Sequence, residues 1–131
     1  AEGLAIPSLK RIMETELGME ATVENARRRR NGKNCEYDVF GYANSSKNTV
    51  IIAEVKNKAN DAAIEQLLSQ LEQFHEFYPE HHDKQVQGLL AAVHFPEGVL
   101  KKALNHGLHI ACLEDDLFKL QDPKGFVAKS Y

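Results

Sequence analysis

The sequence lacks the features that mark several large classes of protein. None of its apolar runs approaches the ~20 residues that a membrane-spanning helix needs, although 43% of its residues are hydrophobic. It has no basic segment followed by an apolar run of the kind that directs secretion, so we expect a cytoplasmic protein. There is also no glycine-rich phosphate loop and no Gly-x-Ser-x-Gly motif.

Cysteine and histidine are too few and too scattered to indicate a zinc site. The two cysteines, Cys35 and Cys112, lie far apart and match no metal-binding spacing. The six histidines include no His-x-x-x-His pair. We therefore expect no zinc, and we expect free thiols in place of a disulfide, as is usual in a reducing cytoplasm.

Length and charge indicate one domain without a generally basic surface. A chain of 131 residues is large enough for a single hydrophobic core, and we expect residues 1–131 to form one domain. The chain begins with Ala1 and not with Met, which leaves open that it is a piece of a longer protein. The net charge of −3 argues against a whole-surface nucleic-acid binder but leaves room for a local basic patch.

Residues 48–58 are the part of the chain around which we expect the rest to be organised. Their β-branched, apolar run predicts a buried central strand. Glu54 and Lys56 interrupt this run, and residues i and i+2 of a strand share a face. One interpretation is an ion pair at a frayed, solvated strand end. The other is a functional pair, because an unpaired buried charge is costly.

A second predicted strand, residues 36–41, carries Asp38 between apolar neighbours. The turn-forming residues of the loop 42–47 predict that the chain folds back as a hairpin, which would bring Asp38 close to Glu54. Two adjacent carboxylates repel unless a cation lies between them, and Mg²⁺ prefers oxygen ligands of this kind. A nearby lysine can stabilise developing negative charge. Together these residues predict a metal-dependent phosphodiesterase site.

The motif Asp38, then Glu54-Val55-Lys56 after a turn and an apolar strand, resembles that of the PD-(D/E)XK nuclease superfamily. The stretches 32–38, 76–80 and 122–126 are similar to an uncharacterised bacterial and archaeal branch of it. The resemblance implies an α/β, restriction-endonuclease-like core, in which a central mixed β-sheet is flanked by α-helices.

The resemblance also implies a chemistry for the motif. Asp38, Glu54 and the Val55 carbonyl would hold Mg²⁺ or Mn²⁺, and Lys56 would orient the attacking water. The expected substrate is nucleic acid, DNA in preference to RNA, and a homodimer is compatible with cutting two strands.

Two further candidates come from the same resemblance. The first helix of such nucleases often supplies another acidic residue, and Glu2 stands where this branch carries it. RecB-like nucleases have a Gln-x-x-x-Tyr element on the helix after the motif, and Gln70 begins a similar stretch that has Phe74 in place of tyrosine. For both Glu2 and Gln70, a plain solvent-facing side chain is the alternative.

Hydrophobic periodicity and turn residues predict the order helix, three strands, helix, strand, helix, strand, with a short edge strand after them. The expected segments are 1–17, 22–30, 34–43, 48–58, 61–77, 86–95, 99–105, 108–113 and 117–120.

The predicted hairpin of residues 22–43 carries a cluster of basic side chains at its tip, and one more basic residue ends the motif strand. These candidates for contacts with phosphate are Arg27, Arg28, Arg29, Arg30, Lys33 and Lys58. A hairpin that binds phosphates is one interpretation. The other is a solvated, charged edge that blocks aggregation.

Two rival functions stay open at this point. The chain could be a nuclease-like module that binds nucleic acid or protein without cleaving, as its acidic net charge favours. Alternatively, the apolar helix 61–77 could serve as a homo-oligomer surface. The intact set of Asp38, Glu54 and Lys56 favours the enzyme, since a binding module has no need of a lysine beside paired carboxylates.

Overall fold

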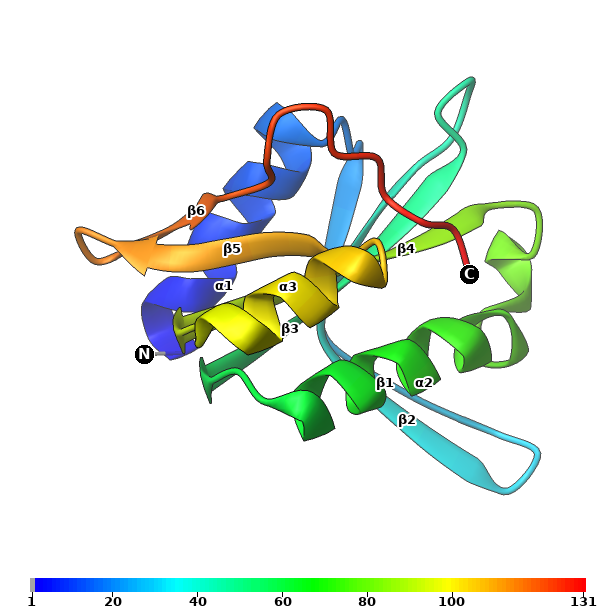
Figure 1. Cartoon of the computed structure of the whole chain (residues 1–131). Helices are drawn as coiled ribbons and strands as arrows, with labels where there is room; N and C mark the ends of the chain where they lie inside the picture. The colour runs from blue at the N-terminus through cyan, green and yellow to red at the C-terminus, as the bar shows by residue number, and fades with distance from the viewer. Residues whose placement is uncertain (1) are drawn as a thin grey trace.

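The computed structural model describes residues 2–131, with side chains from Ala5 onward, and it consists of one mixed sheet with helices on both faces (Figure 1). The helical elements are α1 (Glu2–Arg11), a π-helical turn (Ile12–Glu16), α2 (Asp61–Phe77), a 3₁₀ turn (Pro79–His81) and α3 (Glu97–Asn105). The strands are β1 (Ala21–Arg30), β2 (Lys33–Ala43), β3 (Thr49–Lys58), β4 (Gln85–His94), β5 (His109–Glu114) and β6 (Leu117–Leu120). The predicted fold class and order of elements are confirmed.

The six strands lie in the sheet in the order in which they occur in the chain. β1, β2 and β3 form an antiparallel meander, β4 and β5 then run parallel to β3, and β6 returns antiparallel to β5. Helices α2 and α3 make the two parallel connections, as a crossover between parallel strands requires. The motif strand β3 therefore lies inside the sheet, between β2 and β4.

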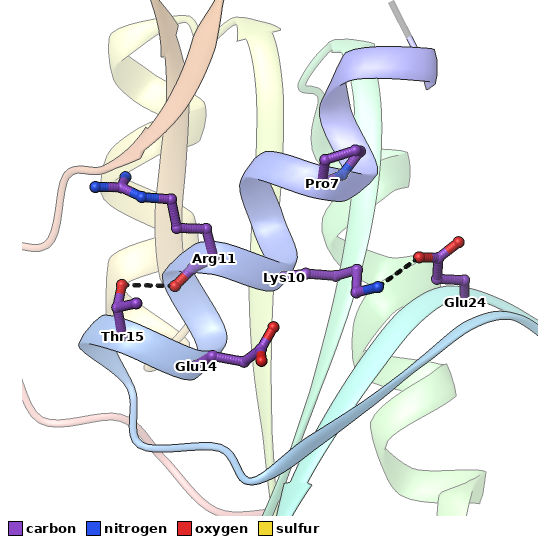
Figure 2. Close-up of a pocket in the computed structure, with 6 residues that line it drawn as sticks. All are labelled: Pro7, Lys10, Arg11, Glu14, Thr15 and Glu24. Atoms are coloured by element: carbon purple, nitrogen blue, oxygen red, sulfur yellow. Dashed lines mark hydrogen bonds and ion pairs between the residues drawn. The ribbon is translucent and has the colours of Figure 1, made fainter.

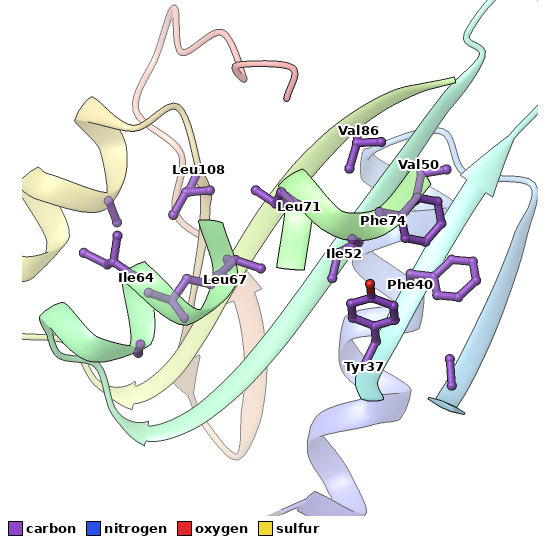
Figure 3. Close-up of a cluster of buried hydrophobic side chains, with 14 of the residues drawn as sticks. Tyr37, Phe40, Val50, Ile52, Ile64, Leu67, Leu71, Phe74, Val86 and Leu108 are labelled. Atoms are coloured by element: carbon purple, nitrogen blue, oxygen red, sulfur yellow. The ribbon is translucent and has the colours of Figure 1, made fainter. Parts of the chain in front are cut away.

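A large apolar cluster fills the space between the sheet and helices α2 and α3 (Figure 3). Its aromatic centre brings Phe74 of α2 within 5.3 Å of Phe40 and 5.9 Å of Tyr37, measured between ring centroids. Both Phe74 and Phe40 are at most 1% exposed. Burial of this kind contributes roughly 1.5–3 kcal/mol for each large side chain, so this cluster fixes α2 across β2 and β3.

A second apolar cluster lies on the opposite face of the sheet, beneath α1. The predicted helix 1–17 is confirmed in outline, with Pro7 inside α1. Its last turn differs from the prediction, because it widens to a π-helix before Leu17. Gly18 then takes a left-handed conformation, φ +74°, as expected of a residue that ends a helix.

Two local signals in the sequence act as predicted. Asn31 and Gly32 both have positive φ, +51° and +76°, which matches the tight hairpin turn between β1 and β2. Asn60 caps α2, because its side-chain oxygen accepts a hydrogen bond from the Ala63 N–H at 2.8 Å. A cap of this kind stabilises a helix by about 1 kcal/mol.

The C-terminal tail after β6 is anchored to the body of the protein. Asp122 accepts hydrogen bonds from the Ile110 N–H and pairs with His109, and the ring of Phe126 lies 5.3 Å from that of His109. The Tyr131 N–H donates to the Val86 carbonyl at 2.7 Å. The thiols of Cys35 and Cys112 are free. No helix in the described part of the chain has the length and apolar character needed to cross a bilayer.

Candidate active site

The candidate site lies where β2 and β3 separate. These strands pair only from Ala43 opposite Thr49 to Val39 opposite Ala53. Beyond this point β2 continues with β1 toward the hairpin tip, and β3 continues with β4 as far as Lys58. Figure 1 shows the two strands diverging toward opposite sides of the molecule. We call this separation the fork.

Asp38 and Glu54 are the first residues beyond the last pair of the β2–β3 ladder, so they face each other at the base of the fork. The Asp38 carboxylate accepts a hydrogen bond from the Val55 N–H at 2.9 Å, and it thereby satisfies a backbone donor that the departing strand leaves free. The carboxyl groups of Asp38 and Glu54 are within hydrogen-bonding reach of each other. The predicted meeting of these two side chains is confirmed.

Glu54 is buried, with only 4% of its surface exposed. Burial, and then the hydrogen bond and charge of Asp38, raise the pKa of Glu54 to about 8, while Gln70 and Lys56 act in the opposite direction. This excludes the interpretation of Glu54 as half of a solvated ion pair at a frayed strand end. At neutral pH the base of the fork therefore holds a proton, and a cation could replace that proton.

Gln70 of α2 connects the two arms of the fork. Its amide nitrogen donates to Glu54 Oε1 at 2.6 Å and to the backbone carbonyl of Glu36 at 3.3 Å. Its own Oε1 atom is buried and has no hydrogen-bond partner among the described residues. Gln70 is therefore part of the site and not an exposed flank of the helix. The sequence could not indicate the part played by the Glu36 carbonyl, because every residue has a backbone carbonyl.

Lys56 and Val55 complete the motif. Lys56 lies two residues beyond Glu54, half-buried on the same face of β3, and its charge favours the ionised form of Glu54. The Val55 N–H points to Asp38, and the carbonyl of a strand residue points to the same side as its N–H. The Val55 oxygen consequently faces the fork together with the two carboxyl groups.

The oxygens at the base of the fork suit a hard divalent cation, but they come from only two acidic side chains. No group of three or more metal-ligating side chains occurs among the residues whose side chains the structure describes. The side chain of Glu2, the predicted third acidic residue, lies outside the described residues. A site built from Asp38, Glu54 and the Val55 carbonyl would complete its coordination shell with water or substrate oxygens, as Mg²⁺ commonly does.

The basic residues of the β1–β2 hairpin fall into two groups. Arg28 is already engaged in contacts within the protein. Its guanidinium donates hydrogen bonds to the Phe77 carbonyl at 3.0 Å and to Glu80 at 2.8 Å, and it lies 3.9 Å from the centre of the Tyr78 ring. Arg28 thus fastens the hairpin to α2.

The other hairpin residues are more exposed. Arg27 forms a surface ion pair with Glu36 at 3.3 Å, and Lys33 forms one with Glu76 at 3.5 Å. Exposed pairs of this kind contribute little to stability. Arg29 and Arg30 are exposed and have no ion pair within the described part of the chain. Lys58 is exposed at the end of β3, on the other arm of the fork.

A hollow of about 340 Å³ beside α1 shows a different pattern of charge (Figure 2). Its lining includes Lys10 and Arg11 but also Glu14 and Glu24, and Lys10 forms an ion pair with Glu24 at 2.8 Å. None of the motif residues lines it. Its mixed charges offer no net attraction for an anion, so the candidate site remains the fork.

Comparison with protein families gives one assignment. Residues 5–120 match the family model described as a domain of unknown function, DUF8196. The chain belongs to this family. Comparison of the DUF8196 chain with curated protein sequences gave no match.

Solved structures share the fold of this DUF8196 chain. A repair endonuclease from Pyrococcus abyssi is 24% identical with a TM-score of 0.59, over 87% of this chain and 47% of that one. EndoMS in a complex with dsDNA is 24% identical with a TM-score of 0.51, over 84% and 44%. Protein VC1899 from Vibrio cholerae is 19% identical with a TM-score of 0.59, over 85% and 29%. This chain therefore spans less than half of each, and the likeness shows a nuclease-like fold.

The raised pKa of Glu54 predicts how stability depends on pH. The folded protein keeps a proton on Glu54 up to about pH 8, whereas the unfolded chain loses it near the ordinary value of 4.5. The folded state thus binds more protons in this window, and its stability falls as the pH rises through it. Glu54→Gln removes this loss. The free energy of unfolding of the variant, measured relative to that of wild type, should therefore rise by on the order of 2–4 kcal/mol between pH 5 and pH 8.

Urea denaturation at several pH values in a chelating buffer measures this difference. Glu65→Gln, which changes an exposed glutamate of α2, is the matched control and should follow wild type throughout. Parallel curves for wild type and Glu54→Gln would contradict the burial and pairing of Glu54.

Proposed function

We propose that this chain is a metal-dependent nuclease of the PD-(D/E)XK type, which hydrolyses phosphodiester bonds of DNA in preference to RNA. The observation that carries the proposal is the buried carboxyl pair of Asp38 and Glu54 with Lys56 beside it. Like charges held together in a buried place need a proton or a cation between them, and a structural role would not explain the added lysine. The likeness to a repair endonuclease and to EndoMS bound to dsDNA supports the choice of DNA.

Asp38, Glu54 and the Val55 carbonyl would hold Mg²⁺ or Mn²⁺, with Glu2 a further candidate ligand. A bound cation of this kind lowers the pKa of an attacking water and neutralises charge on the scissile phosphate. Gln70 holds the Glu54 carboxyl in place through its 2.6 Å hydrogen bond. Lys56 places an ammonium group where negative charge develops during attack, and it can also orient the water. The expected product carries a 5′-phosphate.

Cleavage assays test this proposal most simply. We expect wild type with Mn²⁺ or Mg²⁺ to cut at least one of supercoiled, linear or branched DNA, more rapidly than it cuts RNA. Lys56→Ala should lower the rate roughly 100-fold or more, the usual effect of removing one group that stabilises the transition state. Lys101→Ala is the matched control, because Lys101 is an exposed lysine of α3 in a surface i,i+4 pair, and it should cut like wild type.

Three results would each contradict a part of this proposal. Equal cleavage by wild type and Lys56→Ala would place the activity elsewhere or in a contaminant. Preferential cleavage of RNA would overturn the choice of substrate. If the protein binds DNA in a gel-shift assay but never cuts it, it is a binding module, which is the alternative that the acidic net charge favours.

The exposed residues of the hairpin predict a salt-dependent contact with DNA. Arg29 and Arg30 are exposed and free of ion pairs among the described residues, so they can neutralise phosphates. In a Lys56→Ala background, Arg29→Ala and Arg30→Ala should each reduce the slope of log affinity against log salt concentration by about one. Fluorescence anisotropy with a labelled duplex measures this slope.

Arg11→Ala provides the matched control for the hairpin, since Arg11 is an exposed arginine on α1 and outside the hairpin. It should leave the slope unchanged. If the hairpin variants and Arg11→Ala all have the same slope as the Lys56→Ala parent, the hairpin does not contact phosphates and is a solvated, charged edge.

A further inference from the structure

The side chains of β1 and β2 change faces partway along both strands. In β2, Tyr37 packs in the apolar cluster beneath α2, whereas Val39, two residues later, packs in the cluster beneath α1. In β1, Ala26 lies in the α2 cluster, whereas Glu24 pairs with Lys10 of α1. Residues i and i+2 of a regular strand share a face. Both strands therefore lose their alternation at the same level.

Asn25 and Asp38 stand opposite each other at this level. The ladder pairs Glu24 with Val39 and Ala26 with Tyr37, and it skips the pair between them. Asn25 has φ +47°, a left-handed conformation that costs most residues energy but that asparagine and glycine adopt more readily. One left-handed residue is enough to turn the chain and reverse which face the following side chains occupy. The reversal is thus centred on Asn25.

The reversal determines where the Asp38 side chain goes. Had β2 continued the alternation set by Phe40, Asp38 would point into the aromatic cluster beneath α2. Had it continued the alternation set by Tyr37, Asp38 would point to the α1 face. At the turning point Asp38 packs in neither apolar cluster, and its carboxylate reaches β3, where it meets the Val55 N–H and Glu54.

We propose that Asn25 is a positioning residue of the site: its left-handed backbone holds the Asp38 carboxylate in the fork. Asn25 is exposed and acts only through Asp38. The part of this inference that concerns cleavage rests on the proposed function, whereas the placement of Asp38 against Glu54 does not.

Substitutions at Asn25 separate backbone conformation from side-chain chemistry. Asn25→Gly keeps access to positive φ and should leave the site as it is. Asn25→Val opposes positive φ because its side chain is β-branched, and Asn25→Ala opposes it more mildly. If the valine variant does not fold, the alanine variant takes its place in every comparison. Asn34→Val is the matched control, because Asn34 is an exposed asparagine of the same hairpin with no positive φ.

The first readout does not depend on activity. NMR-detected hydrogen exchange of the Val55 amide follows its hydrogen bond to the Asp38 carboxylate, which should protect that amide in wild type and in Asn25→Gly. In Asn25→Val the Val55 amide should exchange roughly 10-fold or more faster as Asp38 withdraws, because a hydrogen bond to a charged group is lost. The second readout is cleavage of DNA with Mn²⁺. Loss of a residue that orients a metal ligand should cost about 10-fold to 100-fold in Asn25→Val, with near wild-type rates in Asn25→Gly and Asn34→Val.

The outcomes distinguish this inference from the proposed function. If no variant cleaves DNA but the exchange of the Val55 amide changes as described, the positioning role stands and the nuclease fails. If wild type cleaves and Asn25→Val changes neither the exchange of the Val55 amide nor the cleavage rate, the positioning role is wrong and the nuclease stands. Equal impairment by glycine and valine would also overturn it, because the asparagine side chain and not its backbone conformation would then be responsible.

Discussion

The site depends on two carboxyl groups that are held together against their mutual repulsion. Glu54 is buried beneath α2, and Asp38 is fixed beside it by the Val55 N–H. Burial and the neighbouring acid together raise the pKa of Glu54 to about 8, so the pair favours a state that carries a proton or a cation. A fold gains no stability from such a pair, which is why we interpret it as functional.

The rest of the fold serves to keep this pair in place. The separation of β2 from β3 leaves the Val55 N–H without a partner strand, and this N–H donates a hydrogen bond to the Asp38 carboxylate instead. Gln70 spans the two arms of the fork from α2, and the aromatic cluster around Phe74 holds α2 against both strands. These contacts come from β2, β3 and α2 together, and the site is accordingly a property of the packed domain.

Regular structure was predictable from the sequence, and much of the site was not. Period-two alternation placed Glu54 and Lys56 on one face, and Asn31-Gly32 marked the hairpin turn. The burial of Glu54 depends on tertiary neighbours, which a single strand does not reveal. Arg28 and Arg29 look alike in the sequence, yet only Arg28 meets Tyr78 and Glu80. No pattern in the sequence indicated the π-helical turn at the end of α1. The left-handed backbone of Asn25 was not predictable either, because a single asparagine within a strand usually has ordinary extended backbone angles.

The proposed function requires a divalent cation to take the place of the proton that Glu54 holds beside Asp38. Calorimetric titration with Mn²⁺ at pH 7, repeated in buffers with different ionisation enthalpies, measures binding and proton release together. We predict that wild type releases close to one proton for each Mn²⁺ bound, and that Asp38→Ala loses the binding. Binding without proton release, or equal binding by wild type and Asp38→Ala, would contradict a cation site at the fork.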